Sequence, residues 1–424
     1  MNRATTSDVI VVGGGIGGLG AALGLSRQGL DVTVYESSSE FGEVGAGLQI
    51  APNGARVLDQ YGLLDEVRRH GVSPDAMVML DAIEGTELTR LDLRDLEHRY
   101  GFPYLVTHRS DLHGALLRAC QDADVELLTD HKVTEYENIP GGARVHFESG
   151  STASADVVVA ADGLHSTARR QFVGDRAVSS AYVAYRGAVP IEQARDNHIF
   201  EDSVVVYVGP RCHFVQYPLR GGEMFNQVAV FESPKALAGM EDWGTPDELD
   251  HAFDGTCQAV QDGLPLMWRD RRWRMYDRDP IKNWVYGNVV LLGDSAHPPL
   301  QYIAQGAIMA LEDGWVLAEH VSLQQRSRHR PGAGVDWREV TRAYNEVRTA
   351  HCERVQLTSR KWGRLWHHDG AQREQRNLLL RARDTYDYTY TDWLYGPTAL
   401  TTDQEPRIYP SIALGAESMR SASR

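Results

Sequence analysis

A glycine-rich turn between two apolar segments near the N-terminus constrains this chain more than any other feature. Val9 to Val12 is a run of β-branched residues without polar alternation, as a strand buried on both faces of a parallel sheet requires. The next residues fit the pattern G-x-G-x-x-G at Gly13, Gly15 and Gly18, and an apolar helical segment follows as far as Leu25. The order strand, glycine turn, helix predicts a dinucleotide-binding unit.

A second strand completes this unit and ends in an acid. Asp31 to Tyr35 has the pattern of a second short strand, and Glu36 follows it directly. In such a unit the three glycines allow a tight turn, a close approach of the backbone to a pyrophosphate, and close packing of helix on strand. Glu36 is placed to hydrogen-bond a ribose hydroxyl. The alternative is that the glycines only pack the helix on the sheet, and the turn alone does not separate a flavin from a nicotinamide dinucleotide.

Composition narrows the class of protein. A chain of 424 residues with 42% hydrophobic and 24% charged side chains is expected to form two domains, or one large domain with an appended one, and not to be fibrous or disordered. Its net charge of −15 argues against binding to nucleic acid. The four cysteines lie far apart, which predicts neither a zinc ribbon nor a disulfide framework and favours a reducing cytoplasm; no metal site is expected. The uncharged segment Val9 to Leu25 is too rich in glycine for a membrane span, so no integral membrane segment is expected.

Two later motifs point to the cofactor. The apolar run Val157 to Ala161 ends in Asp162-Gly163, and Gly293 to His297 follows the apolar run Val289 to Leu292. With the glycine turn, and in this order, these motifs resemble the three-motif signature of the FAD-dependent aromatic hydroxylases, the single-component flavoprotein monooxygenases. The resemblance covers essentially the whole chain. It implies FAD as the bound cofactor, with NADH or NADPH as co-substrate and O2 as the oxidant.

The resemblance also implies which residues contact FAD. Asp294 stands at the carboxyl end of a strand, where cofactor ligands gather in open α/β sheets, and the matching Asp of the family hydrogen-bonds the ribityl chain. Arg109 matches an Arg that reaches the pyrophosphate. Asp162 matches an Asp near the cofactor, with the alternative that it caps the turn before a helix. Gly306 and Ala307, which open a later helix, complete the predicted cofactor residues.

The middle of the chain predicts a second kind of sheet. Between about Tyr182 and Glu232 short alternating strands follow one another without helices, which indicates an antiparallel sheet. We therefore expect an α/β protein: a Rossmann-like FAD-binding domain with a parallel sheet, an antiparallel-sheet substrate domain, and C-terminal helices. The predicted division is 1–180 and 281–370 for the FAD-binding domain, 181–280 for the substrate domain, and 371–424 for a C-terminal segment.

Two segments indicate a branch of the family. The segment Ala304 to Ala307 resembles the salicylate-hydroxylase branch, but position 301 holds Gln where that branch carries Pro. Gln301 together with the segment Arg211 to Pro218 is similar to the branch that converts 3-hydroxybenzoate to gentisate, 2,5-dihydroxybenzoate. The resemblance thus implies a small aromatic acid as substrate and a homodimer as the assembly.

The chemistry of this branch assigns roles to three residues. A flavin C4a-hydroperoxide delivers electrophilic oxygen, and the ring carbon para to a phenol becomes nucleophilic when the phenol loses its proton. Alternation along one strand places His213 and Tyr217 on the same face. We take His213 as the proton acceptor, because an imidazole changes charge near neutral pH, and Gln301 and Tyr217 as groups that orient the hydroxyl or the carboxylate. The alternative is that His213 is only a hydrogen-bonded histidine on a sheet face.

Other functions remain open at this point. A salicylate 1-hydroxylase, or a hydroxylase of another aromatic compound in secondary metabolism, would share the cofactor motifs; the former would release catechol and carbon dioxide. A non-redox carrier with the same nucleotide-binding fold would lack the Gly293-Asp294 motif and the pocket histidine. His297 is expected to be structural because it lies in the cofactor loop, and His367 and His368 show no ligand spacing.

Overall fold

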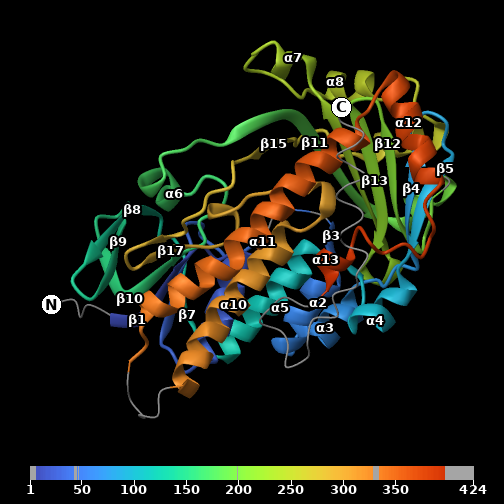
Figure 1. The fold of residues 1–424 in the computed structure, drawn as a ribbon. Coiled ribbons are helices and arrows are strands. Elements are labelled where there is room, and N and C mark those ends of the chain that lie inside the picture. The colour runs from blue at the N-terminus through green and yellow to red at the C-terminus, as the bar shows by residue number, and fades with distance from the viewer. Residues whose placement is uncertain (1–5, 43–44, 46, 198, 328–333, 397–424) are drawn as a thin grey trace.

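Two large sheets organise the protein (Figure 1). The computed structural model describes residues 6–42, 45, 47–197, 199–327 and 334–396. The first sheet has the strand order β16-β17-β10-β1-β2-β7, and the β8–β9 hairpin extends it beside β10. Its strands are β1 (Thr6–Val12), β2 (Val32–Tyr35), β7 (Glu126–Leu128), β8 (Val133–Ile139), β9 (Gly142–Phe147), β10 (Thr152–Ala160), β16 (Val285–Tyr286) and β17 (Val289–Leu291).

The centre of this sheet consists of the apolar segments that the sequence marked. Strand β1 pairs in parallel with β10 and with β2, so that Val9 lies beside both Val157 and Val32, all three buried. Helices α1 (Ile16–Ser26) and α10 (Gly306–Ser327) pack against each other at short range. A Cβ atom on Gly24 would lie only 3.0 Å from the Ala318 Cβ, so small residues set this distance. The predicted parallel, dinucleotide-binding core is confirmed.

The second sheet has seven strands in the order β15-β11-β14-β13-β12-β4-β5. Pairing is antiparallel except between β12 and β4, which run in parallel. The four strands predicted between residues 182 and 232 are present as β11, β12, β13 and β14. The strands are β4 (Ala76–Asp81), β5 (Glu87–Asp92), β11 (Val178–Pro190), β12 (Ser203–Gly209), β13 (Cys212–Leu219), β14 (Met224–Glu232) and β15 (Trp273–Asp277).

Strands β4 and β5 of this sheet were not anticipated. They come from residues 76–92, inside the first segment assigned to the FAD-binding domain, so the chain crosses to the second sheet and back early on. Alternation alone marks a strand and not the sheet that it joins, because pairing depends on a strand, β12, more than a hundred residues away. The boundaries at 180, 280 and 370 stay predictions.

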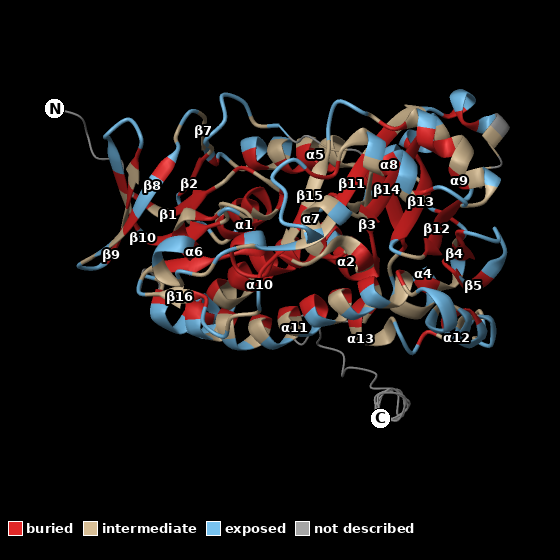
Figure 2. Cartoon of the chain, turned by 90° about the horizontal axis from the view of Figure 1, so that it is seen from above, coloured by how far each residue is buried: buried red, intermediate tan, exposed pale blue. Residues whose placement is uncertain are grey.

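A small sheet and a group of helices connect the two large sheets. The small sheet pairs β3 (Gly47–Ile50) with β6 (Leu105–His108), and β6 leads directly into helix α5 (Arg109–Asp122). The other helices in the first two-thirds of the chain are α2 (Pro52–Gln60), α3 (Leu64–His70), α4 (Arg94–Tyr100), α6 (Thr167–Phe172), α7 (Pro234–Leu237), α8 (Pro246–Ala252) and α9 (Gln258–Gly263). Figure 2 shows the buried residues concentrated in the two sheets and in the helix faces that cover them.

The C-terminal helices complete the substrate side of the molecule. Helix α11 (Trp337–Trp366) runs along the molecule, and α12 (Gly370–Arg381) and α13 (Asp392–Tyr395) follow it (Figure 1). Helix α12 is fixed to the end of β4 by Asp81, whose carboxylate accepts hydrogen bonds from Arg373 at 2.6 Å and from Asn377 at 2.7 Å. Burial raises the pKa of Asp81, but these hydrogen bonds outweigh it and lower the pKa to about 2. Within the part of the chain that the structure describes, no helix is both long and apolar enough to cross a bilayer.

Candidate active site

The glycine turn, residues 13–18, is shaped by backbone and has no room for side chains. Gly13 has a positive φ of +108°, and a Cβ atom there would lie 2.4 Å from the Ala161 carbonyl oxygen. A Cβ atom on Gly18 would lie 1.9 Å from the Gly13 carbonyl oxygen. Gly15 is the N-cap of α1, so the positive end of that helix opens on the turn. The turn is therefore a cradle in which backbone amides can meet a pyrophosphate.

Glu36 stands beside this turn, at the end of β2. One carboxylate oxygen accepts a hydrogen bond from the Gly14 amide at 2.8 Å, and the other accepts from the Ser38 amide at 2.8 Å. Partial burial raises the pKa of Glu36, but these hydrogen bonds outweigh it, so the pKa lies below its usual range. The acid is thus an anion fixed at the position where the sequence predicted a ribose partner.

Four further predicted cofactor residues line one cavity with the glycine turn. Arg109 is the first residue of α5, Asp294 lies just after β17, and Gly306 and Ala307 begin α10. The cavity has a volume of about 760 Å³ and runs from Gly15 to the C-terminal helices. Asp294 thus lies just beyond the carboxyl end of a parallel strand, whereas Arg109 reaches the cavity from the small sheet and Gly306 and Ala307 reach it from the start of α10.

Asp162 has a different environment. Its Oδ2 atom accepts hydrogen bonds from the Tyr136 hydroxyl at 3.0 Å and from the Thr167 and Ala168 amides at 2.8 and 3.2 Å. Its neighbours Ala161 and Gly163 line the cavity, but Asp162 is not among the lining residues. These contacts support the capping alternative for the Asp162 side chain.

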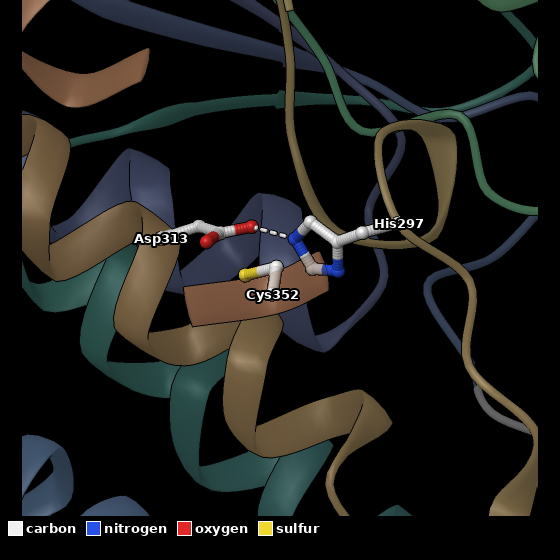
Figure 3. A group of neighbouring side chains, drawn as sticks. All are labelled: His297, Asp313 and Cys352. Carbon is white, nitrogen blue, oxygen red and sulfur yellow. Dashed lines mark hydrogen bonds and ion pairs between the residues drawn. The ribbon is translucent and has the colours of Figure 1, made fainter. Parts of the chain in front are cut away.

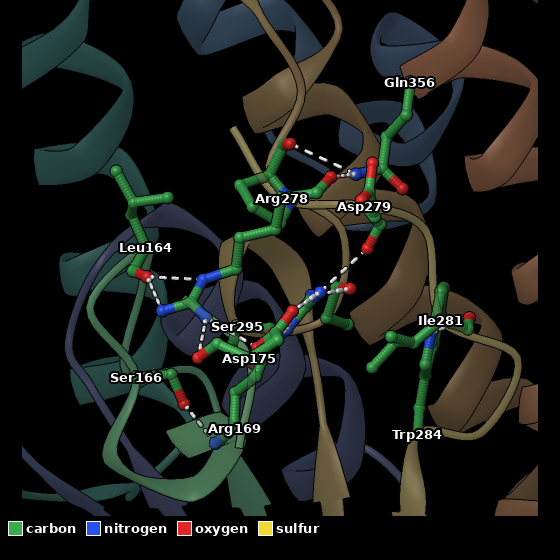
Figure 4. A network of polar contacts seen from close by, with 12 residues as sticks. Leu164, Ser166, Arg169, Asp175, Arg278, Asp279, Ile281, Trp284, Ser295 and Gln356 are labelled. Atoms are coloured by element: carbon green, nitrogen blue, oxygen red, sulfur yellow. Dashed lines mark hydrogen bonds and ion pairs between the residues drawn. The ribbon is translucent and has the colours of Figure 1, made fainter. Parts of the chain in front are cut away.

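Two buried arginines hold the loop that follows Asp162 (Figure 4). Arg169 donates to the Ala296 carbonyl at 2.5 Å and forms an ion pair with Asp175. Arg278 donates to the Leu164 carbonyl and reaches the same Asp175 carboxylate at 2.6 Å. Since Ala296 belongs to the segment after Asp294, this network joins the two later motifs into one rigid wall of the cavity.

A second network lies under the cofactor loop, residues 293–297. The Asp313 carboxylate accepts a hydrogen bond from the Gly293 amide at 3.0 Å, from His297 Nε2 at 2.5 Å and from Arg348 Nε at 2.7 Å. Burial disfavours the charged form of both His297 and Asp313, but the attraction between opposite charges is the larger effect. Asp313 raises the pKa of His297 well above its usual value, and His297 and Arg348 lower the pKa of Asp313 to about 2. We call His297, Asp313 and Arg348 the buried ion cluster.

The same place contains three side chains with metal-ligating atoms. His297, Asp313 and Cys352 offer such atoms within 4.8 Å of one another, as Figure 3 shows. Asp313 is already matched by two cationic partners, and His297 points its Nε2 atom at the carboxylate. A metal ion would have to displace that hydrogen bond and compete with Arg348. The geometry thus favours ion pairs that hold the cofactor loop, in agreement with the structural role expected for His297.

The three predicted catalytic residues line the opposite part of the cavity. His213 and Tyr217 project from β13, with Val215 between them on the same face, and Gln301 begins the short helical turn 301–303 after the cofactor loop. Tyr217 packs against β3: a Cβ atom on Gly47 would lie 2.3 Å from its ring. Burial raises the pKa of Tyr217 above its usual value, so its hydroxyl stays protonated. The alternation argument is confirmed for this face of β13.

His213 is almost completely buried and has one hydrogen-bond partner, His367. The Nδ1 atom of His213 lies 2.8 Å from Nε2 of His367. Burial lowers the pKa of His213 well below its usual value, and His367 lowers it further. The imidazole is therefore neutral at neutral pH, and its Nε2 atom is the one left for the cavity. We call His213 and His367 the histidine pair.

Gln301 has a cationic partner that the sequence analysis missed. Arg186, on β11, lines the cavity and donates from Nη2 to Gln301 Oε1 at 3.3 Å. Its guanidinium also lies 5.6 Å from the centre of the Trp273 ring. Burial lowers the pKa of Arg186, and among the residues with described positions no carboxylate counteracts this effect. Arg186 is thus a cation in the cavity wall that can pair with an anionic ligand.

The residues present fit FAD. The glycine turn excludes protein side chains, and Gln305, at the entrance of α10, has a buried Nε2 donor without a partner in the described chain, while its Oε1 accepts from Asn53 at 2.9 Å. An unpaired buried donor in a cavity wall is costly unless a ligand accepts from it. The fixed acid Glu36, the acid Asp294 in the cavity wall and the cation of Arg109 complete a set suited to ribose, ribityl and pyrophosphate groups.

Sequence reasoning missed His367 and Arg186 for different reasons. Arg186 lies opposite Val228 in the strand pairing, and Val228 lines the cavity, so alternation in β11 carried a usable signal. His367 carried none, because it lies just after the end of α11 and meets His213 only through the packing of that helix on the second sheet.

Comparisons with known proteins agree with this geometry. A family model described as "FAD binding domain" matches residues 6–361. The 3-hydroxybenzoate 6-hydroxylase of Polaromonas naphthalenivorans (strain CJ2) is 38% identical over 92% of this chain and 95% of its own length. The 3-amino-4-hydroxybenzoate 2-monooxygenase of Streptomyces cremeus is 36% identical over 92% and 95%. Klebsiella pneumoniae HpxO complexed with FAD and uric acid superposes with a TM-score of 0.77 at 28% identity, covering 88% of this chain and 92% of that one.

Proposed function

Because the chain belongs to the FAD-binding family of aromatic hydroxylases, flavin-dependent monooxygenases, we propose that it hydroxylates a phenolic acid para to the hydroxyl, converting 3-hydroxybenzoate to gentisate. The observation that carries this proposal is the pair of opposed groups in the cavity: a neutral histidine, His213, and a cation, Arg186. A hydroxybenzoate has a phenol for the first and a carboxylate for the second. Relatives named for 3-hydroxybenzoate at 34–38% identity support the same substrate.

The cofactor end of the cavity supplies the oxidising chemistry. A bound FAD would supply, with NADH or NADPH and O2, the chemistry that transfers an electrophilic oxygen to the ring. The protein contributes a fixed place: the glycine turn and Arg109 for the pyrophosphate, Glu36 for the adenosine ribose, and Asp294 for the ribityl chain. The buried ion cluster keeps Asp294 in register through the Gly293 amide.

The substrate end orients the ring and handles its proton. Arg186 pairs with the carboxylate, and Gln301, which already bonds Arg186, fixes the position of that guanidinium. His213 accepts the phenol proton through Nε2, and Tyr217, kept protonated, donates to the aromatic acid. Val206, Val215 and Val228 give the rest of this part of the cavity an apolar lining. Such a site excludes water from the oxygen transfer.

The main alternative is a related benzoate with a different position of attack. The relatives that act on 3-amino-4-hydroxybenzoate are 34–36% identical, so family membership alone does not separate the two substrates. Salicylate 1-hydroxylation, giving catechol, is a second alternative with the same cofactor residues. The product distinguishes all three.

The test is oxygen consumption with NADH over a panel of hydroxybenzoates, with the products identified by chromatography. We expect gentisate from 3-hydroxybenzoate, and we expect NADH oxidation to be stimulated by the aromatic acid, since this step depends on a bound substrate. Catechol from salicylate, or product only from 3-amino-4-hydroxybenzoate, would replace the proposal by the corresponding alternative.

A substitution tests the role of His213. His213→Ala should leave FAD binding and anaerobic flavin reduction nearly intact and cut hydroxylation by roughly 10²- to 10⁴-fold, the usual contribution of a general base. Hydrogen peroxide should rise as gentisate falls. Val215→Ala is the matched control, because it also opens space in the same strand face but removes no proton acceptor. A His213→Ala enzyme with wild-type turnover would leave His213 a structural residue.

We also propose a homodimer in the cytoplasm. All four cysteines are unpaired, which suits a reducing compartment. Light scattering of the purified holoenzyme measures the assembly, and a monomer at working concentrations would refute the dimer.

A further inference from the structure

The second member of the histidine pair, His367, is held as firmly as the first. It caps the C-terminus of α11, and its ring stacks on Tyr182 with 4.5 Å between ring centres and an interplanar angle of 13°. Trp366 and Tyr302 complete the aromatic surroundings of the pair. The backbone of His367 has its own contacts, since its carbonyl accepts from the Arg211 amide at 3.3 Å. The imidazole is therefore not needed to fix the path of the chain.

The surroundings of the pair keep both rings uncharged. Burial, the cation Arg376 and the ring of His368 together lower the pKa of His367 to about 3. The other titratable groups near the pair are the hydroxyls of Tyr182 and Tyr302 and the Cys212 thiol, all with pKa values raised by burial, with Glu232 and Asp81 beyond them. None of these supplies a carboxylate in contact with either imidazole, unlike Asp313 beside His297.

Two neutral imidazoles 2.8 Å apart share a single proton between them. When His213 Nδ1 carries that proton, His213 Nε2 is a bare acceptor that faces the cavity. When His367 Nε2 carries it instead, His213 Nε2 holds a proton and becomes a donor. The direction of this one hydrogen bond therefore goes with the state of the cavity-facing atom of neutral His213: acceptor when His213 Nδ1 donates, donor when His367 Nε2 donates.

We propose that His367 is a positioning residue for the hydroxylation: its Nε2 atom accepts the Nδ1 proton of His213 and so holds His213 in the tautomer with a bare Nε2. This inference rests on the proposed function. In the step the phenol O–H bond breaks and His213 Nε2–H forms, while His213 keeps Nδ1–H in its hydrogen bond to His367. The electron pair stays on the phenolate oxygen, and the positive charge rests on His213. The transfer reverses when that oxygen is protonated again, so no co-reactant is consumed.

Keeping the transient charge on His213 has a physical advantage. The imidazolium stays next to the phenolate, where opposite charges attract, and its Nδ1–H donates a charge-assisted hydrogen bond to His367. The cation Arg376 disfavours a charge on His367 itself.

The test compares His367→Phe and His367→Gln in the FAD-loaded enzyme. Phe keeps the stacking on Tyr182 and removes the acceptor for Nδ1–H, while Gln offers a carbonyl oxygen to that proton. With 3-hydroxybenzoate, we expect His367→Phe to lower the ratio of gentisate to NADH consumed by about tenfold or more, and to raise the pH at which the bound phenol ionises, read from its ultraviolet difference spectrum. His367→Gln should restore most of both. His368→Gln is the control, as its neighbour on the same turn, and should behave like the wild type.

A second measurement separates this inference from the proposed function. Two-bond ¹⁵N–¹H spectra of histidine-labelled holoenzyme report the tautomer of His213 without any turnover. We expect protonated Nδ1 and bare Nε2 in the wild type, and a change of tautomer in His367→Phe. If the wild type makes no gentisate but shows this tautomer, the proposed function is wrong, while the role of His367 in setting the tautomer of His213 is supported. A protonated His213 Nε2 that is indifferent to His367→Phe, or unchanged coupling and phenol ionisation in that variant, would overturn the inference.

Discussion

The cofactor side and the substrate side of the cavity each contain a histidine that is 1% exposed, and the two behave in opposite ways. His297 lies against Asp313 and has a raised pKa, whereas His213 lies against His367 and has a lowered one. Burial disfavours the charged form equally in both places. The neighbour decides: a carboxylate stabilises an imidazolium, and a second neutral imidazole does not.

This difference matches the work of each region. The buried ion cluster joins α10, α11 and the cofactor loop with fixed charges, which suits a part that must not move during the reaction. The histidine pair keeps an uncharged ring at the cavity, which suits a group that must gain and lose a proton. Four predictions test this contrast, in order of expected size.

The largest effect is expected in the buried ion cluster. Asp313→Asn removes the carboxylate that His297 and Arg348 share, although Arg348 keeps its ion pair with Glu312 at 2.9 Å. We expect a loss of about 3–5 kcal/mol in the free energy of unfolding, because removing one partner of a buried ion pair is strongly destabilising. FAD affinity should fall as well, since the Gly293 amide loses its charged acceptor. Urea unfolding of the holoenzyme measures the first and flavin fluorescence the second.

The control for that variant is Glu346→Gln. Glu346 pairs with Arg342 at 2.7 Å on the exposed face of α11, with both side chains about 60% exposed. Such a pair contributes less than ~1 kcal/mol. Equal losses in the two variants would contradict the structural role given to the buried ion cluster.

The second prediction concerns the cation of the substrate side. Arg186→Met should weaken binding of 3-hydroxybenzoate by about 1.5–3 kcal/mol, roughly 10- to 150-fold in Kd, because a hydrogen bond to a charged group is lost. Phenol, which has no carboxylate, should bind both enzymes alike. Titration followed by flavin absorbance measures the two affinities, and an equal loss for phenol would refute the carboxylate role.

The third prediction returns to the cofactor side. Glu36→Ala removes the acceptor beside the glycine turn and should weaken FAD binding by about 1–3 kcal/mol, while activity at saturating FAD largely returns. Glu40→Ala, an exposed acid four residues further on, is the control. If flavin affinity is unchanged, Glu36 does not contact the ribose.

The effect that is smallest at neutral pH is a difference in pH dependence. The pKa of His367 is about 3 in the folded protein and ~6.5, the ordinary histidine value, in the unfolded chain. Between these two pH values His367 is protonated only in the unfolded chain, so the free energy of unfolding falls as the pH falls through this window. His367→Phe should make that slope shallower by up to ~1.4 kcal/mol per pH unit.

His297 should show the opposite sign. Its raised pKa stabilises the folded protein fully below ~6.5, and this contribution is lost as the pH rises toward the folded value. His297→Phe should therefore reduce the loss of stability above neutral pH and leave the acid side unchanged. Urea unfolding at several pH values measures both slopes, and slopes that change in the same direction would contradict the comparison.

The sequence predicted well where contacts are close along the chain. The glycine turn, α1 and Glu36 fall within about thirty residues, and the residues of this segment alone predict the turn that needs glycine at position 13. Alternation likewise placed His213 and Tyr217 on one face, because the period of a strand is a local property. The FAD cofactor and the two-sheet fold followed from such local patterns.

The sequence by itself therefore determined the cofactor cradle, the class of fold and the face of β13 that meets the substrate. Only the tertiary structure decided what stands opposite that face. His367 reaches His213 across 154 residues, and Arg186 reaches Gln301 across 115. Residue type and spacing do not predict these two contacts, because the contacts depend on how α11 and the second sheet pack around the cavity. The charge state of each buried histidine depends on those neighbours, and so it too was settled by packing.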